Sequence, residues 1–431
     1  MRYEGIRSLP GVGAAALGPA LERVIRGVLF IYIIVLPFQR LLVVERNGFL
    51  LLLLLLVLWS AANRTHFFQR TPIDLPLAAF VGWVGLSIPF ATFPAYSVQE
   101  FGKLLQQVLL FYVVLYFFNA EQYRRSLLWA LIIVSMIISA YGIEEFFGMA
   151  GLLPAFKQMR MIESFTPGEV WLTTYLVMTI PICLAFMLFE QRWFERTVYA
   201  AATVLGVVCL LLTNSRAGLL ALLVELGLVI LMLRRKTLVL GVAVFCVVLI
   251  AVEAVVVHYN VVELPGTTMT IRGLGSPPLL HRFEIWEFTT KKILQHPLLG
   301  VGYGKDNFRL VYAASGEPVQ AYYAPVLDAG THNIFLDLAL GAGLPAAAAF
   351  VWLLWRIVST ALGKFRASDS PVQKAVILGI GVSVIGMAVR LSFDQMLVGT
   401  LAVQFWIWIA LCLGTQRARE AGSNCFAMNR A

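Results

Sequence analysis

Two arginines and one histidine have settings in which they could bind an anion and move a proton. Arg216 lies in the short turn TNSRAG, residues 213–218, between two apolar runs. Asn214 or Ser215 can cap the helix that follows, which places Arg216 in its first turn. The helix dipole disfavours a cation there, whereas the exposed N–H groups attract anions. Arg216 is therefore explained either by a bound phosphate or by a side chain that reaches to the water interface.

Arg282 could supply a second guanidinium. It precedes Trp286 by four residues in a stretch, about 279–294, that predicts a helix, so both side chains share one face. A planar guanidinium can hold a phosphate through two parallel hydrogen bonds. The alternative is a surface arginine that stacks on Trp286.

His332 is the candidate general base. It stands next to Asn333 at the start of an apolar run, with Thr331 as the expected helix cap. A histidine there could be neutral near pH 7 and accept a proton. Asp337 follows five residues later, about 140° further around a helix, so it is not expected to orient His332. The alternative is a capping or interfacial histidine.

Weaker candidate contacts come from a glycine-rich stretch and from a later turn. The stretch HPLLGVGYG starts at His296 and contains Gly302 and Tyr303. Glycines permit positive φ and close backbone approach, but neither the P-loop nor the dinucleotide motif is present. Arg390 and Asp394 flank another turn, where the arginine could contact phosphate or pair with the carboxylate. Asn333 and Trp286 are further candidate substrate contacts.

The elements that must position these residues are membrane helices. Hydrophobic residues make up 60 % of the 431 positions, charged residues only 13 %, and the mean hydropathy is +0.82. Soluble proteins carry roughly 25 % charged residues. The expected fold is therefore an all-α polytopic membrane protein with about 12 transmembrane helices. The apolar runs fall at about 24–44, 48–62, 73–91, 104–118, 124–143, 170–189, 197–213, 216–233, 238–257, 332–358, 374–392 and 396–414.

The basic residues indicate the orientation of the chain. With a cytoplasmic N-terminus, 20 of the 33 basic residues fall on the cytoplasmic side, which predicts that both termini are cytoplasmic. The formal charge of +9 is then a topology signal and not an indication of nucleic-acid binding. The five cysteines form no CxxC or Cys/His cluster, so neither a metal site nor a disulfide framework is predicted.

Three regions follow from this pattern. Residues 1–257 are expected to hold transmembrane helices 1–9, and residues 258–330 a large extracytoplasmic loop region with short helices. Residues 331–431 are expected to hold helices 10–12 and a cytoplasmic tail. The first two runs predict a tight hairpin that turns at residues 45–47, and the first is expected to be a retained span. Glycine and proline at 341–345 predict a kink in the tenth span.

Together, these motifs resemble the bacterial O-antigen ligase family, within the wider O-antigen ligase/polymerase superfamily. The layout of twelve spans, with one large loop before the histidine-bearing span, also resembles that family. The motifs that carry the resemblance are Ser215-Arg216-Ala217-Gly218, Arg282-x-x-x-Trp286, His296-Pro-x-x-Gly300-x-Gly302-x-Gly304 with Phe308, and His332-Asn333 followed by Gly341, Gly343 and Pro345.

The resemblance implies transfer of O-antigen polysaccharide from undecaprenyl pyrophosphate to a lipid A–core acceptor in lipopolysaccharide biosynthesis. The active site would lie on the periplasmic face of the bacterial inner membrane, in a GT-C-related fold. The family is similar to inverting, metal-independent glycosyltransferases, so no cofactor or metal is expected. Its functional arginines would correspond to Arg216 and Arg282, and its histidine to His332.

Three alternatives stay open at the level of sequence. An O-antigen polymerase performs the same chemistry on a growing chain, and a protein O-oligosaccharyltransferase shares the histidine region. The third alternative is a transporter of polysaccharide or lipid. It predicts ionisable residues in mid-membrane and inverted repeats, for which Glu225 and Glu253 are the only candidates and no repeat is visible.

Overall fold

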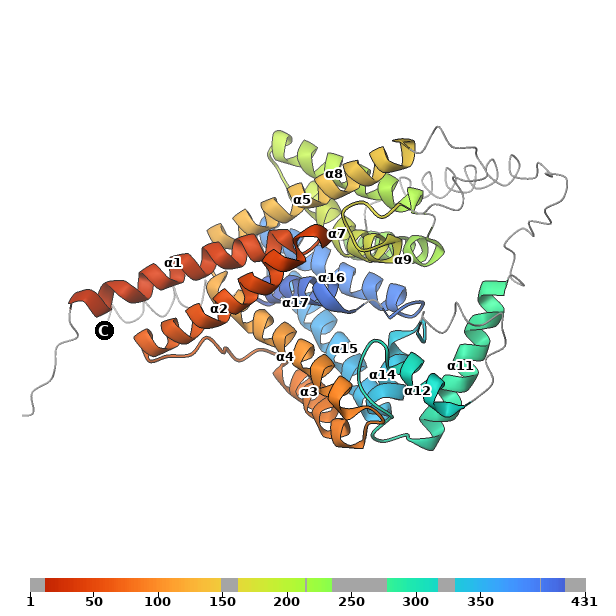
Figure 1. Cartoon of the computed structure of the whole chain (residues 1–431). Coiled ribbons are helices and arrows are strands. Elements are labelled where there is room, and N and C mark those ends of the chain that lie inside the picture. Colours follow the sequence, from red (N-terminus) through yellow and green to blue (C-terminus); the bar gives the residue numbers. More distant parts are fainter. Residues whose placement is uncertain are drawn as a thin grey trace, which may run out of the picture.

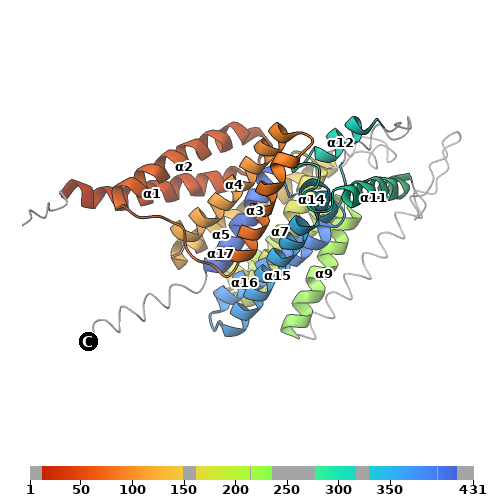
Figure 2. The same ribbon diagram turned by 90° about the horizontal axis from the view of Figure 1, so that it is seen from below.

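The computed structural model describes residues 12–148, 162–213, 215–234, 277–316, 330–395 and 397–414. The regular elements in these ranges are all helical, and most of them run roughly side by side in a bundle (Figure 1). A separate group of helices, α11, α12 and α14, lies at one end of this bundle (Figure 2). This end is called the site end below.

Long apolar helices make up the bundle. Eight of the described helices have the length and hydropathy to cross a membrane, and two shorter apolar helices accompany them. This supports a polytopic membrane protein. The total of about twelve transmembrane helices stays a prediction, because the expected span at 238–257 lies outside the described residues. The bundle helices are α1 (Val12–Val35), α2 (Leu42–Asn63), α3 (Asp74–Ser87), α4 (Pro94–Phe117), α5 (Glu121–Gly148), α7 (Glu169–Phe189), α8 (Trp193–Leu212), α9 (Arg216–Leu233), α15 (Leu344–Ala367), α16 (Pro371–Leu391) and α17 (Gly399–Leu413).

The pair α7 and α16 forms the centre. Both are apolar on all sides, as expected of helices buried inside a larger bundle, and they pack along their length. Gly379 makes this approach close, since a Cβ there would lie 2.7 Å from the Cα of Ile182. The Ser383 hydroxyl donates to the carbonyl of Met178 at 3.0 Å. The helices α8, α9, α15 and α17 surround the pair.

The first hairpin turns earlier than the sequence pattern suggested. Helix α1 ends at Val35, a 3-10 turn (η1) covers Gln39–Leu41, and residues 45–47 lie inside α2. The predicted turn at 45–47 is therefore wrong. The reason is Pro37, which lacks an N–H and disfavours helical geometry in the residue before it. The two helices do pack together, and the Tyr32 hydroxyl donates to Glu45 at 3.0 Å.

The kink predicted at 341–345 is confirmed. Helix α14 (Ile334–Ala342) ends there and α15 begins at Leu344. Between them Gly343 has a φ of +87°, a conformation that side-chain-bearing residues rarely adopt. The N–H of Leu344 is freed by this break and donates to the carbonyl of Pro297 at 2.8 Å. The break thus ties the start of α15 to the glycine-rich stretch.

Candidate functional site

The glycine-rich stretch is a structural connection between α11 (Pro277–Gln295) and the break after α14. The N–H of Val301 donates to Leu340 and the N–H of Gly302 to Gly341, both at 2.8 Å. Around this connection α11, α12 (Asn307–Ser315) and α14 share a small apolar core of their own. That core holds the helices of the site end together.

The same contacts bear on three candidate residues of the glycine-rich stretch. The N–H groups of Val301 and Gly302 are already bonded to carbonyls, so they are not free to cradle a phosphate. His296 has an exposed side chain, and its carbonyl accepts from the N–H of Gly300 at 3.0 Å. Tyr303 is partly buried against the main core, and burial raises the pKa of its phenol. These contacts give the stretch a structural role, and its residues stay predicted substrate contacts.

His332 has an uncommon backbone conformation. Its φ is +53°, in the left-handed region, which costs a residue with a side chain about 1–2 kcal/mol. Such strain persists only where the surroundings over-determine it. On its C-terminal side, Asn333 caps α14 by accepting from the N–H groups of Phe335 and Leu336. Asn333, and not the predicted Thr331, is therefore the cap.

Contacts from two other helices complete this support. The Asn333 amide donates to the carbonyl of Ser392, just after α16, at 3.1 Å. On the other side, Trp286 donates from Nε1 to the carbonyl of Thr331 at 3.0 Å. Asn333 and Trp286 thus hold the backbone on either side of His332. The sequence had suggested both as substrate contacts.

Gln395 is the residue that sequence reasoning missed. Its Oε1 accepts from the N–H of Thr331 at 2.8 Å and lies 3.0 Å from the Thr331 hydroxyl. Its Nε2 donates to the carbonyl of Lys305 at 3.3 Å. Its amide lies directly against Gly330, where a Cβ would overlap it. A glutamine after an apolar run carries no sequence signal for this role, because its partners come from distant segments.

Three charged groups act on His332. Burial lowers the pKa of its imidazole; the carboxylate of Asp394 raises it, and the guanidinium groups of Arg282 and Arg390 lower it. The net effect is a pKa below the usual 6.5, so His332 is neutral at pH 7 and able to accept a proton. Arg282 is itself half-buried, and this burial lowers its pKa, but an arginine stays charged at neutral pH. The sequence placed these groups on separate segments.

Arg390 and Asp394 form the ion pair that was the alternative in the sequence. The Nη2 of Arg390 lies 3.2 Å from Oδ2 of Asp394, and both side chains are almost completely buried. The other carboxylate oxygen accepts from the N–H of Gln395 at 2.8 Å. Two of the buried nitrogens that have no hydrogen-bond partner within the described ranges lie here, namely Nδ1 of His332 and Nε of Arg390. Buried polar atoms are seldom left in this state, which makes the region a candidate for ligand binding.

Arg216 is the first residue of α9, as the sequence predicted. Ser215 is the cap, and its hydroxyl accepts from the N–H of Gly218 at 3.3 Å. Arg216 is not among the groups that shift the pKa of His332. Helix α9 packs antiparallel to α16, with Glu225 against Gly386. From that contact, the helical rise of 1.5 Å per residue places Arg216 about 7 Å further toward the site end than Arg390.

Glu225 is one of the two ionisable mid-membrane residues that could fit the transporter alternative. Its side chain is 1 % exposed, and neither carboxylate oxygen has a hydrogen-bond partner among the described residues. It packs on Gly386, where a Cβ would overlap the carboxylate, so it is enclosed between α9 and α16. The second mid-membrane candidate, Glu253, lies outside the described residues.

The described fold and site define a class: a polytopic helical membrane protein in which Arg282 and Arg390 lie near a neutral histidine, His332, at the site end. No group of three or more His, Cys, Asp or Glu residues with the arrangement of a metal site occurs in the described part of the chain. Residues 201–351 match the family model described as O-antigen ligase. This segment, which contains Arg216, Arg282 and His332, is therefore similar to the O-antigen ligase family. A search of curated proteins gave no match.

Proposed function

We propose that this protein is a glycosyltransferase of the O-antigen ligase type. It transfers O-antigen polysaccharide from undecaprenyl pyrophosphate to lipid A–core at the periplasmic face of the bacterial inner membrane. The family match supports an enzyme of the ligase/polymerase kind that acts on lipid-linked polysaccharide. The observation that carries the proposal is the neutral, strained His332 beside Arg282 and the Arg390–Asp394 pair.

The reaction is a single displacement with inversion. His332 removes the proton from an acceptor sugar hydroxyl, and the hydroxyl oxygen then bonds to the anomeric carbon of the donor sugar. The bond from that carbon to the pyrophosphate oxygen breaks, and its electron pair leaves with the undecaprenyl pyrophosphate. The proton stays on the imidazole until it is released to solvent. Each bond formed is balanced by one that breaks.

The arginines stabilise the leaving group. Negative charge develops on the bridging oxygen as the bond breaks, and cations placed there lower the barrier. Arg282 and Arg216 bind the pyrophosphate, with Arg216 at the N-terminus of α9, where the N–H groups also favour an anion. Cationic side chains can take the role that divalent cations play in other enzymes, so the reaction is proposed to be metal-independent.

The test is transfer by purified protein in lipid nanodiscs, with lipid-linked polysaccharide, lipid A–core acceptor and excess EDTA. Wild-type protein is expected to form ligated product. His332→Ala is expected to lose about three orders of magnitude in rate, within the range for a general base. His66→Ala, which changes an exposed histidine, is the control. Product at wild-type rates from His332→Ala would exclude His332 as the base.

The same assay separates the alternatives by the molecule that receives the glycan. Product on lipid A–core supports a ligase. Extension of the lipid-linked donor itself, with lipid A–core unused, would identify a polymerase. Product only on an added pilin-like protein would identify a protein O-oligosaccharyltransferase. Loss of product with EDTA would contradict metal independence.

A further inference from the structure

A groove opens between α9 and α15 at the end of the bundle opposite His332. Both helices pack on α16, which forms its floor, and the groove has a volume of about 470 Å³. Figure 2 shows the three helices running together toward this end. The floor is deep where α15 and α16 approach closely, since a Cβ on Gly381 would lie 3.2 Å from the Cβ of Ala361.

The lining of the groove changes from apolar to cationic along its length. Within the bundle it consists of aliphatic and aromatic side chains, among them Leu228, Leu231, Phe365 and Val382. Its outer end is lined by two arginines, one from α9 and one from α15. From Leu228 to Arg234, the residue after α9, the groove extends about 9 Å, more than half of one leaflet of a bilayer.

The arginines are Arg234 and Arg366. Arg234 directly follows α9 in a left-handed conformation, with a φ of +50°, and Arg366 lies in the last turn of α15. Both side chains are exposed. Within the described residues, no acidic group forms an ion pair with either arginine. Two guanidinium groups at the mouth of an apolar groove are complementary to one phosphate that carries a hydrocarbon chain.

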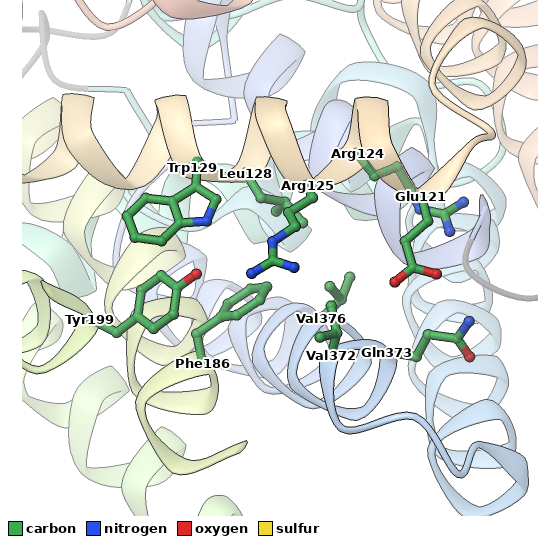
Figure 3. A pocket seen from close by; sticks show the side chains of 10 residues that line it. All are labelled: Glu121, Arg124, Arg125, Leu128, Trp129, Phe186, Tyr199, Val372, Gln373 and Val376. Atoms are coloured by element: carbon green, nitrogen blue, oxygen red, sulfur yellow. The ribbon is translucent and has the colours of Figure 1, made fainter. Parts of the chain in front are cut away.

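A second pocket at this end shows a different arrangement (Figure 3). It lies between α5, α7, α8 and the start of α16, and its volume is only about 20 Å³, roughly that of one water molecule. Its arginines are engaged: Arg125 pairs with Glu195 at 2.6 Å, and Arg124 donates to the carbonyl of Gly414 at 2.8 Å. These arginines join helices, and the pocket has no room for a lipid chain.

We propose that the groove between α9 and α15 binds one acyl chain of an anionic glycerophospholipid, with the phosphate held by Arg234 and Arg366. The donor's pyrophosphate does not account for these arginines, because the site proposed for it lies at the other end of the bundle. The lipid therefore comes from the leaflet at this end. The bound lipid stabilises the placement of α9 beside α15. Because α9 begins with Arg216, the lipid thereby stabilises the helix that carries one of the arginines proposed to bind the donor.

The experiment is native mass spectrometry of delipidated full-length protein, titrated with phosphatidylglycerol or phosphatidylcholine. Wild-type protein is expected to bind the first phosphatidylglycerol at least tenfold more tightly than phosphatidylcholine. In the variant Arg234→Gln/Arg366→Gln this preference is expected to fall below about twofold. The control is Arg64→Gln/Arg196→Gln, because Arg64 also follows a helix in a left-handed conformation, with a φ of +49°. It is expected to keep the preference.

A third variant distinguishes the groove from a charged surface. Leu231 lines the groove and is 68 % exposed, so Leu231→Trp fills the space without disturbing the core. It is expected to weaken phosphatidylglycerol binding at least fivefold, with both arginines intact. Unchanged binding in this variant, or an equal loss in the Arg64/Arg196 control, would show that general surface charge attracts the lipid and would overturn the proposal. So would tighter binding of undecaprenyl phosphate that depends on the same two arginines.

Discussion

Replacement of Gln395 tests the support of His332 most directly. Gln395→Ala removes the acceptor of the Thr331 N–H, a contact to the Thr331 hydroxyl and the donor to the carbonyl of Lys305. Each neutral hydrogen bond contributes about 0.5–1.5 kcal/mol net, so the three together contribute roughly 1.5–4.5 kcal/mol. The left-handed conformation of His332 costs about 1–2 kcal/mol. The free energy from these hydrogen bonds and the cost of the left-handed backbone are of similar size. The Gln395 side chain therefore determines whether His332 keeps this conformation.

Loss of the support allows the backbone around His332 to relax out of its left-handed conformation. The fraction of molecules with a correctly placed imidazole then falls, and kcat is expected to drop about 10- to 100-fold, which corresponds to roughly 1.4–2.8 kcal/mol. The arginines proposed to bind the donor are unchanged in this variant, so the KM for the donor should change by no more than about twofold. A role in folding alone would not produce this separation of kcat from KM.

The assay is steady-state transfer in nanodiscs, with the melting temperature measured in parallel. Gln395→Glu serves as a second variant, because it retains an acceptor for Thr331 and loses the donor to Lys305; an intermediate kcat is expected. Gln373→Ala, at the opposite end of α16, is the matched control. If folded Gln395→Ala keeps a kcat within about twofold of wild type, the proposed support of His332 is wrong.

Two further predictions concern charge and backbone at the same end. With His332 as the proposed base, activity is expected to fall as pH drops through its pKa, which lies below 6.5. Arg390→Gln removes a positive neighbour and should move this acid limb to higher pH, whereas Asp394→Asn should move it to lower pH. Shifts in the same direction, read from pH–rate profiles, would contradict this electrostatic account. Gly343→Ala puts a side chain at a φ of +87° and against a carbonyl of the glycine-rich stretch, so unfolding stability should fall by at least about 1–2 kcal/mol. Gly363→Ala lies within α15 and meets no neighbouring atom, so it should be neutral or slightly stabilising in the same thermal unfolding measurement; equal losses in the two variants would refute the steric argument.

Local properties of the chain were accessible from the sequence. Hydropathy defines membrane-spanning helices because the bilayer core excludes unpaired backbone groups, and this does not depend on neighbouring segments. The helix start at Arg216, the shared face of Arg282 and Trp286 and the break near Gly343 also follow from neighbours in sequence. The hairpin turn was misplaced because the apolar run continued across Pro37, which hydropathy alone does not register.

The arrangement of the candidate site depended on the tertiary structure. The sequence suggested His332, Arg282 and Arg390, but only packing of α11 and α14 near the end of α16 brings their charges to act on one imidazole. The structure also gives structural contacts to other candidate residues: Asn333 and Trp286 support the backbone, and the glycine-rich stretch is bonded to the break after α14. Gln395 could not be found from sequence, because hydrogen bonds between distant segments leave no periodic pattern. Composition and local pattern thus determined the class and the candidate residues, whereas long-range packing determined which of them meet.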